Sequence, residues 1–327
     1  MKTNSNLTAL TLCVMLNGMA ALAADVPYHF IKEIPVGGSA QWDYLKVDSE
    51  AHRLYLSHGT KVEVIDLDKG TVIGAIENTP GVHGIAFAPK LGRAFTSNGQ
   101  ENKASIVDSK TLKTVTKVTT GANPDSILYE PVQNEVYTFN GKGKSATVFE
   151  PESGKVIATI DLGGKPESAA CDGSAGRIYV NIEDKSEVVV IDCKTHAVVN
   201  HWPIAPGETA SGMAIDLEHH RLFLGCDNKK MVMLDSTTGK VVTTVPIGAG
   251  VDANAFDPGT QLAFSSNGED GNTTIAREVA PNKLTVVQTL KTVEGARTMA
   301  LDPQTHNIYL PAPTPAFRVL VYGMDKQ

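Results

Sequence analysis

An aromatic residue recurs about every 42 residues along the chain, and this repeat constrains the fold more than any other feature of the sequence. Each aromatic stands seven positions after an anchor residue that ends a short apolar run. The anchors are Asp48, Ala88, Glu130, Asp172, Asp216, Asp257 and Asp302, and the aromatics are Tyr55, Phe95, Tyr137, Tyr179, Phe223, Phe264 and Tyr309. Only 6% of the residues are aromatic, so seven matches in seven copies indicate a structural repeat.

Each copy contains four short apolar runs separated by polar or glycine-rich turns. In the copy that spans residues 207–248 the runs cover residues 213–215, 222–224, 231–234 and 241–247. Runs of this length and composition predict β-strands. Seven four-stranded antiparallel units predict an all-β fold, a seven-bladed β-propeller, because closing the ring removes the exposed sheet edges of an open array.

The two ends of the chain are complementary. The seventh copy lacks a fourth strand, whereas residues 28–36 match the fourth strand of other copies, as HFIKEIPVGG matches VVTTVPIGAG. We therefore predict that the N-terminal strand completes the last blade. Residues 24–327 are expected to form one propeller domain.

Residues 1–23 are typical of a secretory signal peptide. Lys2 precedes a mostly apolar stretch, and Ala21-Leu22-Ala23 forms a cleavage site, with cleavage expected after Ala23. This segment is too short and too weakly apolar for a membrane anchor. We expect a periplasmic or secreted protein without a membrane span.

Composition and motifs narrow the function. The formal charge of −7, without a run of Lys and Arg, argues against a nucleic-acid partner. The sequence contains no C-x-x-C-H motif and no glycine-rich loop that opens a helix, so neither haem c nor a nucleotide is expected. The mature chain keeps three cysteines, Cys171, Cys193 and Cys226, so at least one is a free thiol or pairs with another chain. We favour buried thiols for all three, and their pairing stays open.

Several repeat motifs resemble a known family. Val-x-Val-Ile-Asp, Thr-Gly-Lys-Val, strands that end in Pro-Ile-Gly, and Arg177-x-Tyr-Val-Asn resemble the YVTN-repeat propellers, and among them the YncE-like secreted bacterial proteins. The resemblance covers essentially the whole mature chain and implies the propeller fold. It implies no catalytic motif, because fold alone does not fix function.

A ring of polar residues marks the predicted channel mouth. In a propeller the first strand of each blade lines the central channel, so the residue five places before each anchor occupies the same position in every blade. These residues are Asp43, His83, Asp125, Glu167, Ser211, Asp252 and Arg297. Their varied chemistry favours ligand binding for the ring as a whole. For any single member, capping of loop N–H groups is the alternative.

Part of this ring has the composition of a metal site. Asp43, His83, Asp125 and Glu167 come from four consecutive blades and would converge on a divalent cation or a cationic group. Trp42 adjoins the ring. His58, in a loop on the same face, is expected to join His83. The Asn-Gly pairs of neighbouring loops (Asn98-Gly99, Asn140-Gly141, Asn267-Gly268) are interpreted as tight hairpin turns.

Three functions compete. We favour a secreted propeller that binds a small molecule or a periplasmic protein through the mouth. The alternative is a metal-assisted enzyme, a lyase or hydrolase, with its carboxylate and histidine site at the same mouth. A quinone-dependent dehydrogenase is disfavoured, because such propellers stack the cofactor on aromatic residues and this chain has only two tryptophans, Trp42 and Trp202.

Overall fold

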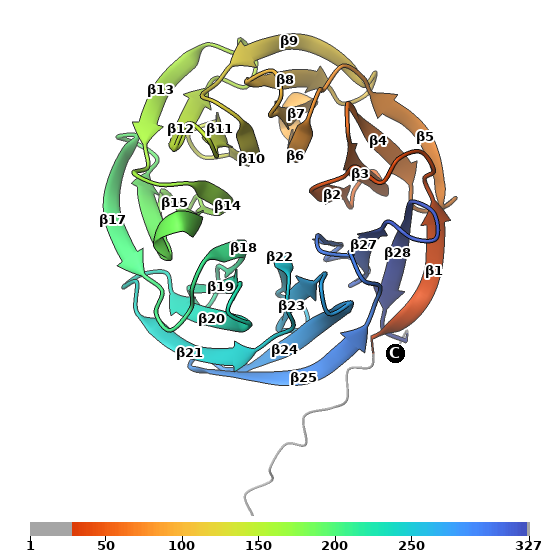
Figure 1. The fold of residues 1–327 in the computed structure, drawn as a ribbon. Helices are drawn as coiled ribbons and strands as arrows, with labels where there is room; N and C mark the ends of the chain where they lie inside the picture. The colour runs from red at the N-terminus through yellow and green to blue at the C-terminus, as the bar shows by residue number, and fades with distance from the viewer. Residues whose placement is uncertain (1–27, 326–327) are drawn as a thin grey trace, which may run out of the picture.

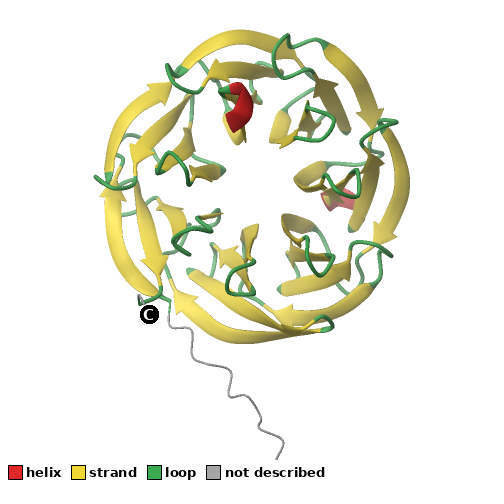
Figure 2. Ribbon diagram, turned by 180° about the vertical axis from the view of Figure 1, so that it is seen from behind, coloured by secondary structure: helices red, strands yellow, loops and turns green. Residues whose placement is uncertain are grey.

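The computed structural model describes residues 28–325, and the predicted signal peptide lies outside them. Within this range seven four-stranded antiparallel sheets are arranged in a ring around a common axis, which confirms the predicted seven-bladed propeller (Figure 1). Two single-turn 3-10 helices, η1 (Pro89–Leu91) and η2 (Glu183–Lys185), interrupt the loops (Figure 2). None of these helices has the length and apolar character needed to cross a membrane.

The first six blades are consecutive in the sequence, and each runs from its inner to its outer strand. Blades one and two contain β2 (Leu45–Asp48), β3 (Arg53–His58), β4 (Lys61–Asp66), β5 (Thr71–Ile76), β6 (Val82–Ala88), β7 (Arg93–Asn98), β8 (Lys103–Asp108) and β9 (Lys113–Thr119). Blades three and four contain β10 (Pro124–Glu130), β11 (Glu135–Asn140), β12 (Ser145–Phe149), β13 (Val156–Asp161), β14 (Pro166–Asp172), β15 (Arg177–Ile182), β16 (Glu187–Asp192) and β17 (Ala197–Pro203). Blades five and six contain β18 (Ala210–Asp216), β19 (Arg221–Cys226), β20 (Lys230–Asp235), β21 (Val241–Pro246), β22 (Val251–Asp257), β23 (Leu262–Asn267), β24 (Asn272–Ala280) and β25 (Lys283–Lys291).

The seventh blade combines strands from both ends of the described chain. From the inside outward it contains β26 (Ala300–Leu301), β27 (Ile308–Ala312), β28 (Arg318–Gly323) and β1 (His29–Pro35). β1 runs antiparallel to β28, with His29 opposite Gly323 and Pro35 opposite Arg318. The outermost strand of the last blade is therefore the first strand of the sequence.

The seven repeated aromatic residues form the core between blades. Each lies in the second strand of its blade, and none is more than 3% exposed. Their flat rings fill the wedge between neighbouring sheets, where each buries a large apolar area. The aromatic residue that recurs in the sequence therefore occupies the same packing position between neighbouring blades in every repeat.

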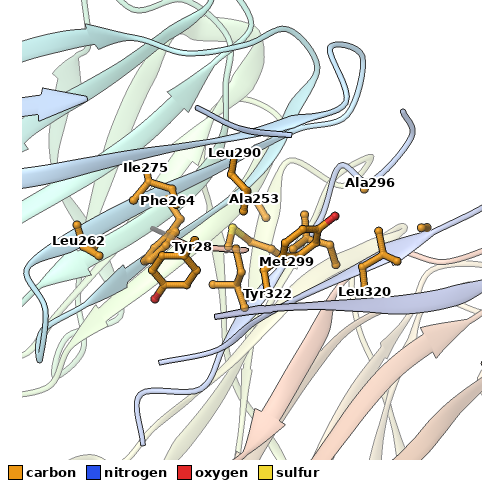
Figure 3. Packing of buried hydrophobic residues seen from close by; sticks show 13 residues of the cluster. Tyr28, Ala253, Leu262, Phe264, Ile275, Leu290, Ala296, Met299, Leu320 and Tyr322 are labelled. Carbon is orange, nitrogen blue, oxygen red and sulfur yellow. The ribbon is translucent and has the colours of Figure 1, made fainter. Parts of the chain in front are cut away.

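Tyr28 links the seventh blade to the sixth. Its ring packs edge-on against Phe264 of β23, with the centroids 5.2 Å apart (Figure 3). Its hydroxyl donates a hydrogen bond of 2.6 Å to the carbonyl of His306, and its backbone N–H donates to Gln288 Oε1 at 2.9 Å. These contacts fix the start of β1 against two blades at once.

Cys171, Cys193 and Cys226, the cysteines within residues 28–325, are free thiols. Cys193 and Cys226 are buried, and Cys171 is half-buried. Burial raises the pKa of each thiol to about 12, so none is a reactive thiolate at neutral pH.

Candidate functional site

A break in the sheet pattern presents side chains to the channel mouth. In five blades the pairing of the first two strands shifts register at the start of the inner strand. Such irregularities bend a strand and redirect its side chains. The segments concerned contain the ring residues His83, Asp125, Glu167, Ser211 and Asp252.

Polar side chains of the second strands hold the ring backbone in place. Ser97 Oγ donates to the carbonyl of Asp125 in the next blade, and Ser266 Oγ donates to that of Arg297. Asn181 Nδ2 donates to the carbonyl of Ser211 at 3.2 Å. In these three cases a blade positions the backbone of the mouth residue in the next blade.

Three of the four predicted metal ligands lie together. His83 Nδ1 is 2.5 Å from Asp43 Oδ2 and 3.7 Å from Asp125 Oδ1. One ligand atom of each residue lies within 4.8 Å of the others, and all three side chains are half-buried. Burial lowers the pKa of His83, but the bond to Asp43 and the charge of Asp125 outweigh it and raise that pKa to about 8.

Glu167 lies outside this three-residue group, and this corrects the predicted four-ligand site. Its Oε2 is 3.3 Å from Lys165 Nζ, without the alignment of a hydrogen bond. Asp125 Oδ1 and Glu167 Oε2 are buried and have no hydrogen-bond donor among the described residues. Burial raises the pKa of both carboxyls, and other mouth acids, Asp43 for Asp125 and Asp125 for Glu167, raise it further. Ionising both carboxyls without a further cation therefore costs free energy.

Arg297 is already engaged. Its Nε lies 2.8 Å from Asp252 Oδ2, its Nη2 donates to the carbonyl of Trp42 at 2.9 Å, and its guanidinium stands 4.8 Å from the centroid of the Trp42 ring. Burial, then the charge of Asp43, raises the pKa of Asp252 to about 6, while Arg297 lowers it. Trp42 therefore fixes the arginine in place at the rim of the mouth.

Tyr44 spans the channel below the ring, and the sequence reasoning missed it. Its hydroxyl lies 3.4 Å from both Glu167 Oε1 and Ser168 Oγ, so a side chain of blade one reaches blade four. Burial, then Glu167, raises its pKa well above the usual value. At the equivalent position the other blades have only small residues, Gly84, Ser126, Ser168, Gly212, Ala253 and Thr298. A single aromatic among them was the available signal.

Gly99 leaves room for the His83 ring. A Cβ at this position would lie 2.7 Å from His83 Nε2 and 2.5 Å from Asn123 Nδ2, closer than carbon contacts allow. The glycine after Asn98 is thus required by the close approach of the imidazole.

The interpretation of the Asn-Gly pairs as tight turns is wrong. Asn98, Asn140 and Asn267 do not have positive φ, and their side chains are fully buried. Each amide instead donates to a hydroxyl seven residues on, in the third strand: to Ser105 Oγ at 2.8 Å, and to Thr147 and Thr274 Oγ1 at 3.0 Å. These amides brace the strand pairs next to the mouth.

His58 is held away from His83. Its Nε2 lies 2.7 Å from the carbonyl of Ser39 and its Nδ1 3.1 Å from Glu63 Oε1, so both ring nitrogens are engaged. Its ring packs on Phe317, with the centroids 4.9 Å apart. The expectation that it joins His83 is therefore not met.

Comparisons with known proteins support the fold. No protein-family model matches the chain, and no curated protein matches it. The structure is similar to a chain titled Kuenenia stuttgartiensis hydrazine synthase, with a TM-score of 0.75 and 13% identity, over 89% of this chain and 99% of that one. It is also similar to a chain in a crystal structure of a mitotic checkpoint complex, with a TM-score of 0.81 and 14% identity, over 99% of this chain and 100% of that one. At such low identity these likenesses show a propeller and nothing about the site.

Proposed function

We propose that this chain is a secreted or periplasmic propeller of the YVTN-repeat, YncE-like kind that binds a positively charged ligand at its channel mouth. β-Propellers in general bind ligands or protein partners. The observation that carries the proposal is the pair of buried carboxylate oxygens, Asp125 Oδ1 and Glu167 Oε2, which no described donor satisfies. Buried acceptors of this kind are costly unless something completes them.

The charge balance of the mouth selects the ligand. Four carboxyls, those of Asp43, Asp125, Glu167 and Asp252, surround one imidazole, and the two other cations, Arg297 and Lys165, already form ion pairs with Asp252 and Glu167. A cation that enters this group replaces carboxylate repulsion with attraction in a partly dehydrated environment. The structure therefore favours an organic ammonium group or a divalent cation over an anion.

Tyr44 lies beside the mouth carboxyls. Because its hydroxyl contacts Glu167 and Ser168, which belong to blade four, a ligand bound to Glu167 would lie close to this hydroxyl.

Secretion rests on the sequence. The proposed signal peptide, residues 1–23 with cleavage after Ala23, supports export, and the free, buried thiols fit a chain that needs no disulfides for its core.

The alternative function is that of a metal-assisted enzyme, a lyase or a hydrolase, and one observation favours it. Asp43, His83 and Asp125 present three ligand atoms within 4.8 Å, a set that fits a divalent transition-metal ion. A metal bound there would polarise a substrate oxygen or lower the pKa of a bound water.

Calorimetry separates these possibilities. Mature protein, stripped of metal, is titrated with Ca²⁺, Mn²⁺, Zn²⁺, Ni²⁺ and Cu²⁺, alongside His83→Ala. A metal equivalent that the wild type binds and His83→Ala does not supports the metal site. If both proteins bind the same number of metal ions, periplasmic extract is passed over immobilised wild type and over Asp125→Asn/Glu167→Gln, and bound small molecules are identified by mass spectrometry. Retention of a cationic compound by the wild type alone supports the binding function, and identical retention by both forms refutes it.

A further inference from the structure

A second group of ligand-type side chains lies at the opposite face from the mouth. Asp216 ends β18, His219 follows in the next turn of blade five, and Glu278 lies near the end of β24 in blade six. Asp216 ends the same inner strand that begins at the mouth with Ser211, so the length of the strand separates the two sites.

The three side chains converge across the seam between the blades. His219 Nδ1 lies 2.6 Å from Asp216 Oδ2 and 3.8 Å from Glu278 Oε2. One ligand atom of each residue lies within 4.8 Å of the other two. The Asp216 and Glu278 side chains are 1% exposed, whereas that of His219 is 32% exposed, so the imidazole links a buried carboxylate pair to solvent.

Glu278 is a buried acid without a donor. Neither of its carboxylate oxygens has a hydrogen-bond donor among the described residues, although both are shielded from solvent. The neighbouring Arg221 is engaged elsewhere, with Asp235 Oδ2 at 2.8 Å, the carbonyl of Pro281 and the side chain of Asn282. A fully buried carboxylate without a donor must take up either a proton or a cation.

Comparison with the other blades shows that Glu278 is exceptional at its position. In five blades a residue at the end of the third strand donates its N–H to the carbonyl of the residue that precedes the second strand. In four of them this residue follows the third strand, whereas in blade six the third strand continues past it to Ala280. The residues that make this bond are Leu67, Ser109, Cys193, Ser236 and Glu278. Four blades therefore place an uncharged side chain in this seam, and blade six alone of these places a carboxylate there, opposite Asp216.

Other seams on this face provide an internal comparison. His306 Nδ1 lies 2.7 Å from Asp257 Oδ2, and His196 Nε2 lies 2.9 Å from Glu135 Oε2. Neither pair belongs to a group of three ligand-type side chains among the described residues. A histidine–carboxylate pair is thus an ordinary way to join two blades here, and the third ligand distinguishes the Asp216 seam.

We propose that Asp216, His219 and Glu278 form a binding site for a divalent transition-metal ion of the zinc class that ties blade five to blade six. Two carboxylates and one imidazole are a ligand set that zinc accepts, with water in the fourth position on the exposed side of His219. Metal–ligand bonds of about 2.0 to 2.1 Å place tetrahedral ligand atoms ~3.3 Å apart. The two separations from His219 Nδ1, 2.6 and 3.8 Å, lie on either side of that value, so small side-chain rotations complete the site.

The test uses His83→Ala as the background, so that binding at the mouth does not contribute. Metal-free protein is titrated with Zn²⁺ by calorimetry, and with Co²⁺ while the visible absorption of tetrahedral cobalt is recorded. The background is expected to bind one equivalent of each ion. Adding Glu278→Gln is expected to weaken that event by at least about tenfold, because a direct ligand is lost. The matched control adds His306→Gln, which alters a two-residue seam on the same face and is expected to leave the affinity unchanged.

Two further measurements keep the result decisive. Thermal melts establish that each variant is folded, and His219→Ala, at a half-exposed position, provides a second removal of a ligand. In NMR spectra, Zn²⁺ is expected to shift the His219 ring signals in the background and not in the Glu278→Gln protein. The proposal is overturned if the background binds no Zn²⁺, or if Glu278→Gln leaves the affinity unchanged. Either outcome would mean that a proton alone satisfies the seam, and neither would bear on the mouth.

Discussion

Neutralising Glu167 should change how the stability of the protein depends on pH. Its side chain is 12% exposed, and burial and then the charge of Asp125 raise its pKa from 4.5 to about 8. The folded state therefore holds this proton more tightly than the unfolded state does. The associated stability is fully present below about pH 4.5 and is lost as the pH rises through about 8.

The size of the effect follows from this pKa. A rise of about 3.5 units, at about 1.4 kcal/mol per unit, sets an upper limit of ~5 kcal/mol, of which ~4 kcal/mol is lost between pH 5 and pH 9. Because Asp125 and Glu167 ionise over the same pH range, the two carboxyls share this loss, and the part that Glu167 contributes alone is smaller, on the order of 2 kcal/mol. Glu167→Gln cannot ionise and retains an acceptor for the Tyr44 hydroxyl. Its stability should fall by ~2 to 4 kcal/mol less than that of the wild type over this range.

Urea unfolding at pH 5 and at pH 9 measures this difference for both proteins. Comparing the two pH values for each protein cancels any change in packing that the substitution introduces. Glu152→Gln is the matched control, because it removes the same charge at an exposed position of blade three. If the free energy of unfolding changes equally between pH 5 and pH 9 in the wild type and in Glu167→Gln, the claim that burial and the charge of Asp125 raise the pKa of Glu167 is refuted.

One deletion and two substitutions test the fold and the site. Deletion of residues 28–36 removes β1 and the Tyr28 contacts and should lower the free energy of unfolding by several kcal/mol in denaturant titrations, so an unchanged midpoint would contradict its role in closing the ring. Gly99→Ala should displace the His83 ring and abolish the His83-dependent metal binding with a smaller loss of melting temperature than the deletion, and unaltered binding would show that the imidazole is not needed in its present position. Asn98→Ala leaves Thr96 and Ser105 without their amide partner and should cost about 1 to 3 kcal/mol by urea unfolding, whereas a change within ~0.5 kcal/mol would mean that those hydroxyls bond elsewhere.

The sequence was sufficient to predict the fold because every blade of a propeller has the same strand arrangement, so equivalent residues recur at a nearly constant spacing in the sequence. Tyr55 and its six counterparts occupy one packing position, so comparing copies identified the strands and the ring of mouth residues without any contact information. The same comparison identified the members of the ring but not their distances. Glu167 was grouped with His83 because they are near in ring order, whereas the structure directs its carboxylate toward Lys165 and Tyr44.

Side-chain contacts between different blades could not be predicted by comparing the repeats. Tyr44 reaches the opposite side of the channel, and nothing in its own blade indicates that partner. His219 meets Glu278 only because blade six carries an acid where its siblings do not, and only the strand register shows that the two face the same seam. The Asn-Gly pairs were misread because their amide partners lie in the following strand.

The composite seventh blade imposes an order on folding. Six blades are built from hairpins of neighbouring strands and can form while the chain is still being synthesised. β1, by contrast, waits for β28, whose residues come almost 300 positions later, as in the pairing of His29 with Gly323. Closing so long a loop is entropically expensive and slow compared with hairpin formation. Until it happens, the outer edge of β28 and the backbone of β1 are unpaired, which makes the interval before closure the period when this protein is most vulnerable to aggregation.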